Sequence, residues 1–168
     1  MNRSKTRHAL SPKGRSDPRR PLVLHVYPDS ILRAQCEPVE RFDGDLEDRT
    51  QGMLELMRGH KGIGLAGPQA GVAQRLFVAE WQGVTLCLVN PVIVERSGRD
   101  RMSEGCLSLP GMSVRIERDL EVKVQGYDIR GNRQAYRLEG LWARVVQHEI
   151  DHLDGILICD HHPPKEQA

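Results

Sequence analysis

The sequence predicts a single α+β domain in which mostly antiparallel strands pack around a C-terminal HExxH helix that is expected to bind a metal. Three observations predict this class. At 168 residues with 39% hydrophobic content, the chain can bury one core. Short runs rich in β-branched residues fill its middle and are separated by Gly, Pro, Asn and Asp. Helical patterns lie on both sides of these runs, an order typical of α+β domains and not of doubly wound parallel sheets.

The first 20 residues differ from the rest of the chain in charge and composition. They hold seven Lys or Arg and one Asp, a balance of +6, so the total of +1 leaves −5 for residues 21–168. The segment is rich in Ser, Pro and Gly and has little to bury, which predicts a basic, disordered extension before a folded domain at 21–168. Such an extension could serve only solubility, could contact ribosomal RNA phosphates, or could be an organelle transit peptide.

Two helices are expected to flank the strand-rich middle. The first covers 45–58, where Leu and Met residues form one apolar side and Gly59 or Gly62 lies near the end. The second covers 139–153, and Gly155 is placed to stop it. Its inward-facing residues are expected to be Leu141, Trp142, Val145, Val146 and Ile150.

The middle of the chain alternates between strand patterns and turn residues. Residues 128–132, Asp-Ile-Arg-Gly-Asn, are typical of a hairpin connection. The expected strands cover 75–80, 84–90, 92–96, 120–127 and 133–138.

We expect a soluble protein of the cytoplasm. No run of about 18 apolar residues is present to cross a bilayer, and the N-terminus lacks the apolar region of a secretory signal. An organelle is the alternative location if residues 1–20 are a transit peptide. The four cysteines contain no CxxC pair, so reduced thiols or a metal ligand are expected in place of disulfide bridges.

The strongest chemical signal lies on the second expected helix, as His148-Glu149-Ile150-Asp151-His152. Residues four positions apart share one face of a helix, so both imidazoles can reach one metal ion. Glu149 is then placed to take a proton from a metal-bound water, as in metallohydrolases. Two histidines can also occur on a helix as ordinary surface or core residues, so the third ligand decides.

A catalytic metal site normally has three protein ligands and an open position for water. In metzincin proteases the third ligand is a histidine six residues after the second one. Gly155 fits that pattern, but Ile158 occupies the ligand position, so the metzincin interpretation fails. Another donor is Cys106 in the segment 104–110, Glu-Gly-Cys-Leu-Ser-Leu-Pro, although a lone cysteine is more often a small buried residue.

The glycine-rich segment 62–69 is not a phosphate-binding loop, because it lacks the Gly-Lys-Ser/Thr ending of a P-loop. Close approach of another backbone explains its glycines better. Without side chains at Gly62 and Gly64, main-chain groups there could pair with an extended peptide, as an added strand does.

These segments together resemble the peptide deformylase family, whose members carry three motifs in fixed order. The motifs are GxGxAxxQ, EGCLS and HExxH, and they stand here at 62–69, 104–108 and 148–152. The resemblance extends from about 23 to about 160 and so leaves out the basic extension. It implies an enzyme that removes the formyl group from N-terminal formyl-methionine by attack of a metal-bound water on the formyl carbon, releasing formate.

The resemblance also assigns chemical roles to individual residues. Cys106, His148 and His152 would bind one divalent metal, and Glu149 would accept the proton of the attacking water and pass it to the departing amine. The side-chain amide of Gln69 and the backbone N–H of Leu107 would donate hydrogen bonds to the oxyanion.

The resemblance favours Fe²⁺ as the metal. The ligand chemistry alone also suits Zn²⁺, Ni²⁺ and Co²⁺. Expected partners are N-formyl-methionyl peptides and nascent chains, with transient ribosome contact through the basic extension and with neither DNA nor membrane.

The methionine side chain of the substrate needs an apolar pocket. The resemblance places its walls at Ile63, Leu141 and Val145, although ordinary core packing would also explain the last two. Arg144 is expected at the rim, facing peptide or solvent. The family usually has alanine where this chain has Gly67, a difference expected to loosen the loop and affect substrate binding. The implied substrate-binding set is Gly62, Ile63, Gly64, Leu141, Arg144 and Val145.

Two other functions use the same residues differently. A metalloprotease would not need Gln69 and would cut internal bonds of peptides without formyl groups. A metal-binding or ribosome-associated module would keep the metal and the basic extension but show no turnover, and the presence of Glu149 argues against it.

Overall fold

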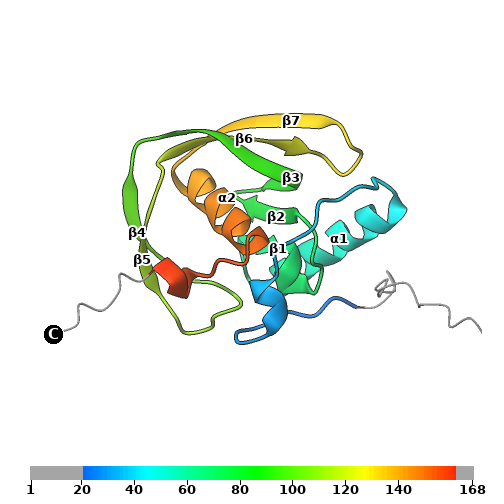
Figure 1. Cartoon of the computed structure of the whole chain (residues 1–168), viewed down its shortest axis with the longest axis horizontal. Helices are drawn as coiled ribbons and strands as arrows, with labels where there is room; N and C mark the ends of the chain where they lie inside the picture. Colours follow the sequence, from blue (N-terminus) through cyan, green and yellow to red (C-terminus); the bar gives the residue numbers. More distant parts are fainter. Residues whose placement is uncertain (1–20, 162–168) are drawn as a thin grey trace, which may run out of the picture.

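The computed structural model describes residues 21–161, which form one α+β domain (Figure 1). Its larger sheet is antiparallel, with β1 (Gly64–Ala66), β2 (Leu76–Trp81), β3 (Val84–Ser97), β6 (Glu121–Tyr127) and β7 (Arg133–Glu139) in that order. A separate antiparallel pair consists of β4 (Asp100–Glu104) and β5 (Val114–Arg118). The helices are η1 (Ser30–Arg33), α1 (Gly44–Gly59), η2 (Gly67–Ala70), α2 (Gly140–Leu153) and η3 (Ile158–His161). The predicted extension at 1–20 lies outside the described residues.

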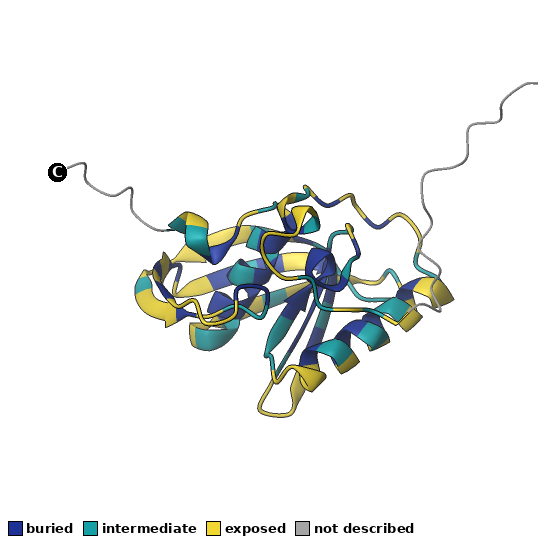
Figure 2. Ribbon diagram, turned by 90° about the horizontal axis from the view of Figure 1, so that it is seen from below, coloured by how far each residue is buried: buried dark blue, intermediate teal, exposed yellow. Residues whose placement is uncertain are grey.

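The centre of the larger sheet is buried on both faces. Successive side chains of a strand point to opposite faces, and in β2 Leu76 and Val78 pack in one apolar cluster with α1. Phe77 and Ala79, on the other face, pack in a second cluster with α2. A strand covered on both faces has a continuous apolar sequence, which explains the run Leu-Phe-Val-Ala. Figure 2 shows the buried residues along the strands and on the helix sides that face them.

Helix α1 confirms the predicted helix to within one residue at each end. Asp43 caps its N-terminus, where the side chain accepts a hydrogen bond from the Leu46 N–H at 3.3 Å. The buried side consists of Leu46, Thr50, Met53, Leu54 and Met57. This packing fixes the loop that follows the helix, and that loop carries the glycine-rich segment.

Helix α2 likewise confirms its prediction, beginning one residue late and ending at Leu153. Gly155 follows with φ +73°, and a β-carbon there would lie 2.7 Å from the backbone oxygen of Arg33. Only glycine fits both conditions, so Gly155 does end the helix region as the sequence indicated. Figure 1 shows α2 enclosed between the larger sheet and the β4–β5 pair.

Strand β3 corrects the prediction of two strands at 84–90 and 92–96. The chain stays in one strand through Pro91, and its pairing with β6 shifts between Val89 and Val92. Asn90 stabilises this irregularity, because its side chain accepts from the Val39 N–H at 2.8 Å and donates to the Val39 oxygen at 2.9 Å. The proline therefore marks a bulge and not an end of the strand.

The sequence prediction missed β1, β4 and β5. β1 has only three residues, and β4 has the polar sequence Asp-Arg-Met-Ser-Glu, so neither shows a strand pattern. The connection between β4 and β5 packs through Leu109 on a third apolar cluster that includes Leu32 and Ile158. In residues 21–161, no helix is long and apolar enough to span a membrane.

Candidate active site

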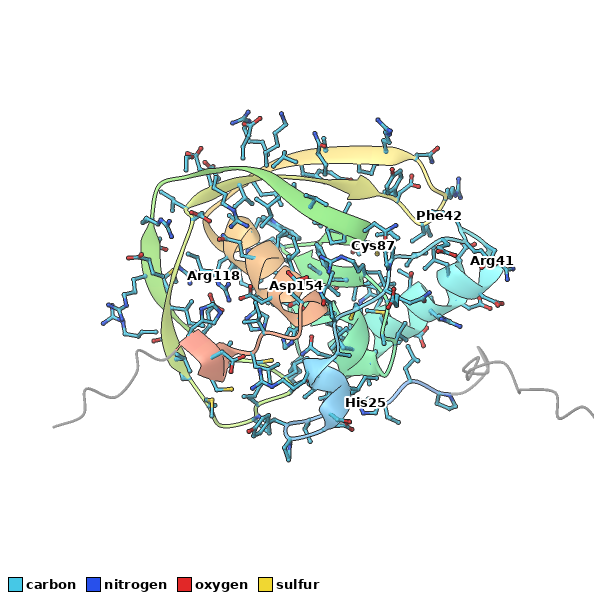
Figure 3. All side chains as sticks on the ribbon, viewed as in Figure 1. His25, Arg41, Phe42, Cys87, Arg118 and Asp154 are labelled. Carbon is cyan, nitrogen blue, oxygen red and sulfur yellow. The ribbon has the colours of Figure 1, made fainter. Side chains whose placement is uncertain are left out.

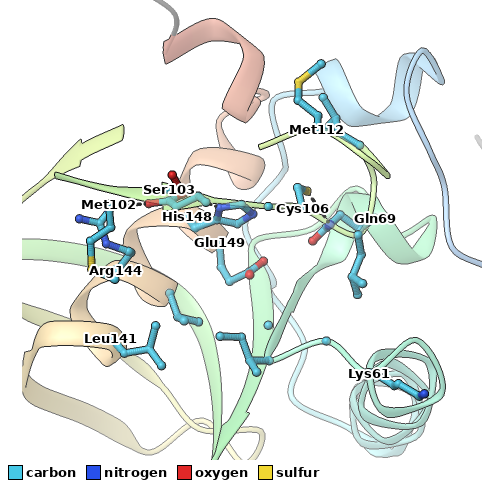
Figure 4. Close-up of a pocket in the computed structure, with 18 of the residues that line it drawn as sticks. Lys61, Gln69, Met102, Ser103, Cys106, Met112, Leu141, Arg144, His148 and Glu149 are labelled. Carbon is cyan, nitrogen blue, oxygen red and sulfur yellow. Dashed lines mark hydrogen bonds and ion pairs between the residues drawn. The ribbon is translucent and has the colours of Figure 1, made fainter. Parts of the chain in front are cut away.

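Three segments that are distant in the sequence converge beside α2 (Figure 4). The helix supplies His148, Glu149 and His152. The connection after β4 supplies Cys106, and η2 supplies Gln69. The convergence follows from the fold, because β1 and η2 contact α2 directly.

The thiol and the two imidazoles form a compact set of ligand atoms. Those of Cys106, His148 and His152 all lie within 4.8 Å of one another. The Cys106 sulfur is 3.3 Å from His152 Nε2. Burial, followed by the positive charges of His148 and Arg118, holds the pKa of His152 well below its usual value, so that this imidazole is neutral. A neutral imidazole is the form that binds metals.

A buried carboxylate orients His148. Glu104 lies 2.9 Å from His148 Nδ1 through its Oε2 atom, which leaves Nε2 directed to the centre of the set. Burial alone would raise the pKa of Glu104, but hydrogen bonds from Arg118 and His148 outweigh it and hold the pKa below its usual range. In the polypeptide alone, hydrogen bonds with Cys106 and Glu104 outweigh the effect of burial and raise the pKa of His148 to about 10. Since a metal binds the deprotonated nitrogen of an imidazole, metal binding competes with protonation of this ring.

An ion network connects Glu104 to the far side of α2. Arg118 donates to both Glu104 oxygens at 2.8 and 2.9 Å and to Asp151 at 2.6 Å. His161 completes it with a 2.9 Å contact between its Nε2 and Asp151. Figure 3 shows Arg118 between the β4–β5 pair and α2. The network fixes β5, Glu104 and the helix relative to one another.

Glu149 is buried, and its Oε2 atom is one of two buried side-chain polar atoms without a hydrogen-bond partner in residues 21–161. The carboxylate faces the cavity beside His148 in Figure 4. Burial raises its pKa to about 7, against the opposing effect of the His148 charge. A carboxylate whose pKa lies near neutral pH, and which has an oxygen without a hydrogen-bond partner, can accept a proton from a molecule in the cavity.

Gln69 and Leu107 present nitrogen donors on the same side. Gln69 is 1% exposed, and its Nε2 atom lies 3.6 Å from the Cys106 sulfur. The backbone N–H of Leu107 donates no hydrogen bond to any residue in 21–161. The Gln69 amide and the Leu107 N–H thus lie on either side of the sequence position of Cys106, and the Gln69 nitrogen is next to its sulfur.

A cavity of about 450 Å³ opens over this centre. Its lining includes every residue predicted to be catalytic, to bind substrate or to bind metal, except His152. The predicted lining residues are Gly62, Ile63, Gly64, Gln69, Cys106, Leu107, Leu141, Arg144, Val145, His148 and Glu149. The sequence analysis missed Lys61, Met102, Ser103, Leu109, Gly111 and Met112. Met102 and Met112 are half exposed on segments without a periodic pattern, so no local signal marks them.

The side chain of Arg144 does not lie where the sequence predicted. Its side chain is 6% exposed and does not face solvent at the rim. The guanidinium donates to Glu104 at 2.7 Å and to the backbone oxygens of Ile116 and Asp100 at 3.0 and 2.8 Å. The reason is the buried charge of Glu104, which lies 40 positions away in sequence and attracts the guanidinium inward. Arg144 thus lines the cavity while its guanidinium is bound inside the protein.

Gly67 lies in a tightly packed part of the loop. It is buried in η2, close to the backbone of residues 72–74. A β-carbon would lie 2.5 Å from the Val72 oxygen and 2.6 Å from the Gln74 oxygen. Backbone atoms occupy the space that alanine would need.

Residues 21–168 match the family model of polypeptide deformylases. The chain belongs to the peptide deformylase family. As a peptide deformylase, it is a metal-dependent hydrolase that removes the N-formyl group from nascent peptides. It is 42% identical over 132 residues to the peptide deformylase of Dictyoglomus thermophilum, covering 79% of this chain and 86% of that protein.

Solved deformylase structures share the fold. That from Thermotoga maritima aligns with a TM-score of 0.83 at 40% identity, covering 86% of this chain and 99% of that chain. One from Synechococcus elongatus, in complex with actinonin, has a TM-score of 0.83 at 38% identity and covers 88% of this chain and 84% of that chain. The family match over 21–168 includes every residue that lines the cavity.

Proposed function

We propose that Cys106, His148 and His152 hold the metal of this deformylase. The observation that carries the proposal is the convergence of one sulfur and two ring nitrogens within 4.8 Å, with the Nδ1 atom of His148 already committed to Glu104. A thiolate and two neutral imidazoles are a ligand set for a divalent first-row metal with an open position. When bound, the ion supplies a Lewis acid that polarises the formyl oxygen and makes water more acidic.

Glu149 is the general base in this proposal. Its unpartnered oxygen faces the cavity, so it can take a proton from the water that attacks the formyl carbon. The same group then delivers the proton to the departing α-amine, which leaves as formate is released. Gln69 Nε2 and the Leu107 N–H stabilise the oxyanion, and such donors are each typically worth about 2.7–4 kcal/mol.

The substrate is an N-formyl-methionyl peptide at the start of a nascent chain, and its methionine side chain occupies the apolar part of the cavity. Ile63, Leu141 and Val145 line that part. Gly62 and Gly64 leave room for the substrate backbone to lie against the main chain of the loop. Arg144 also lines the cavity.

Fe²⁺ is the proposed metal, with Zn²⁺, Ni²⁺ and Co²⁺ compatible with the same ligands. The cytoplasm is the proposed location. Transient ribosome contact is assigned to residues 1–20, which lie outside the described part of the chain.

Elemental analysis combined with a turnover assay tests the metal assignment. Anaerobically purified protein should contain one metal ion per chain and hydrolyse a formyl-Met tripeptide, whereas His152→Ala should lose metal and turnover together. His60→Ala removes an exposed histidine next to α1 and should change neither. Full metal content in His152→Ala would refute the ligand set.

A further inference from the structure

Ser108 lies at the centre of a closed ring of hydrogen bonds that includes Gln69. The His25 N–H donates to the Gln69 backbone oxygen at 2.8 Å, Gln69 Nε2 donates to Ser108 Oγ at 3.1 Å, and Ser108 Oγ donates to the His25 oxygen at 2.7 Å. The Ser108 backbone oxygen also accepts from the Tyr27 N–H at 2.8 Å. The segment before η1, where Figure 3 labels His25, thus joins η2 to the loop after β4.

The ring fixes the direction of each hydrogen bond. A serine hydroxyl has one hydrogen, and here that hydrogen is donated to the His25 oxygen. Ser108 Oγ can therefore only accept from Gln69. The other end of the Gln69 amide is fixed as well, because its Oε1 atom accepts from the Ala66 N–H at 2.8 Å.

One hydrogen of the Gln69 amide remains for chemistry. The nitrogen has two, and Ser108 takes one of them. The other is directed toward the Cys106 sulfur at 3.6 Å and the cavity beside it (Figure 4). Gln69 and Ser108 are 1% and 0% exposed, so water does not compete for these bonds. A donor for a developing negative charge must be held in place before the reaction begins.

We propose that Ser108 is a positioning residue for deformylation, which holds the Gln69 amide with one N–H directed at the reacting carbonyl. His25 contributes through its backbone, so the segment at 25–27 is part of the catalytic structure although it carries no catalytic side chain. The inference rests on the proposed oxyanion role of Gln69. It predicts that Ser108 acts on the rate only when Gln69 is present.

A double-mutant cycle with Ser108→Ala and Gln69→Ala tests this dependence. Ser108→Ala should lower kcat roughly tenfold or more, a part of the 10²–10³-fold effect of losing an oxyanion donor. KM and metal content should stay close to those of the parent enzyme. In the Gln69→Ala background, Ser108→Ala should lower kcat no further.

Three comparisons separate the possible outcomes. Ser113→Ala, an exposed serine outside the cavity lining, is the matched control and should leave kcat unchanged. Ser108→Thr keeps the hydroxyl and should restore most of kcat. If Ser108→Ala does not fold, the same cycle is made with Ser108→Cys, whose thiol bonds weakly.

Equal losses of kcat from Ser108→Ala in both backgrounds would overturn the inference, because the serine would then act independently of Gln69. A full kcat in Ser108→Ala would overturn it too. If Gln69→Ala itself kept full kcat, that result would refute the proposed oxyanion role of Gln69, on which the role of Ser108 depends. The single and double variants therefore distinguish the two failures.

Discussion

A β-carbon on Gly64 would lie 2.2 Å from the Oε1 atom of Glu149, so the strand β1 backbone touches the carboxylate with no room for a side chain between them. Gly64 therefore sets the position of the proposed general base. This contact gives a functional reason for a glycine in the first strand of the sheet.

Gly64→Ala should displace the Glu149 carboxylate and lower kcat/KM by about 10²-fold, since a shift of about 1 Å at a reacting group can have that effect. Steady-state kinetics with a formyl-Met tripeptide measures it. Gly59→Ala is the control, because a β-carbon there meets nothing within 4 Å. Unchanged kinetics in Gly64→Ala would show that the carboxylate does not need this position.

Glu149→Gln should retain one metal per chain and lose activity by roughly 10²–10⁴-fold, the usual contribution of a positioned general base. The carboxylate is active when ionised, so activity in the parent enzyme falls as pH decreases through its pKa. Burial raises that pKa to about 7, and a bound cation shifts it lower. In the variant, the acidic limb of the pH profile of activity should flatten, unless that limb is caused by ionisation of a metal-bound water. A variant that keeps metal and a tenth of the parent kcat/KM would refute the base role.

Arg118→Met should destabilise the fold and weaken metal binding. It removes one of the two arginines bound to the buried Glu104 carboxylate, and because Arg144 remains, the cost should stay below the roughly 3–5 kcal/mol of leaving a buried charge unpaired. The change also loosens the group that orients His148, and loss of such a group typically costs about 10–100-fold in metal affinity. Chemical denaturation and chelator competition measure the two effects. Arg137→Met breaks an exposed pair with Glu95 and should change the free energy of unfolding by less than about 1 kcal/mol. Equal effects of both variants would contradict the role of the network.

Air should inactivate the enzyme if iron is bound through Cys106, because the metal or the thiolate is oxidised. Replacement of iron by nickel or cobalt should lengthen the half-life of activity in air. The measurement compares the metal forms of one preparation under air and under nitrogen. Equal half-lives in air for all forms would count against iron.

Deletion of residues 1–20 should leave turnover of a formyl-Met tripeptide nearly unchanged, since the cavity is lined by residues between Lys61 and Glu149. The shortened protein should bind ribosomes less tightly than the full chain. Ribosome binding by the full chain should weaken as the salt concentration increases. A large loss of tripeptide turnover would mean that the extension contributes to the cavity.

Local patterns predicted most of the secondary structure. Both long helices and the strands β2, β6 and β7 agree with the expected ranges to within a few residues, because periodicity and end signals lie within each segment. β4 was missed because a polar strand exists only through its partner, β5. Pro91 was taken as a break because its accommodation depends on Asn90 and the distant Val39.

In the candidate site, too, features set by local sequence were predicted and features set by distant contacts were not. Its three motifs are local, and the sequence indicated the residues that the fold brings to one cavity. The burial of Arg144 could not be predicted, because it depends on Glu104 from another element. The ring through Ser108 was missed for the same reason, since His25 lies 83 positions from the serine.

The hydrogen bonds among residues 25, 69 and 108 also bear on how the enzyme unfolds. They join points spread over half of the chain, and a further backbone bond ties Cys36 to Leu153 at the end of α2. A fragment shorter than residues 25–153 lacks at least one of these partners, so folding of a shorter segment alone leaves the cavity incomplete. Activity should accordingly follow the fraction of globally folded molecules during denaturation, with an unchanged KM for those that remain folded.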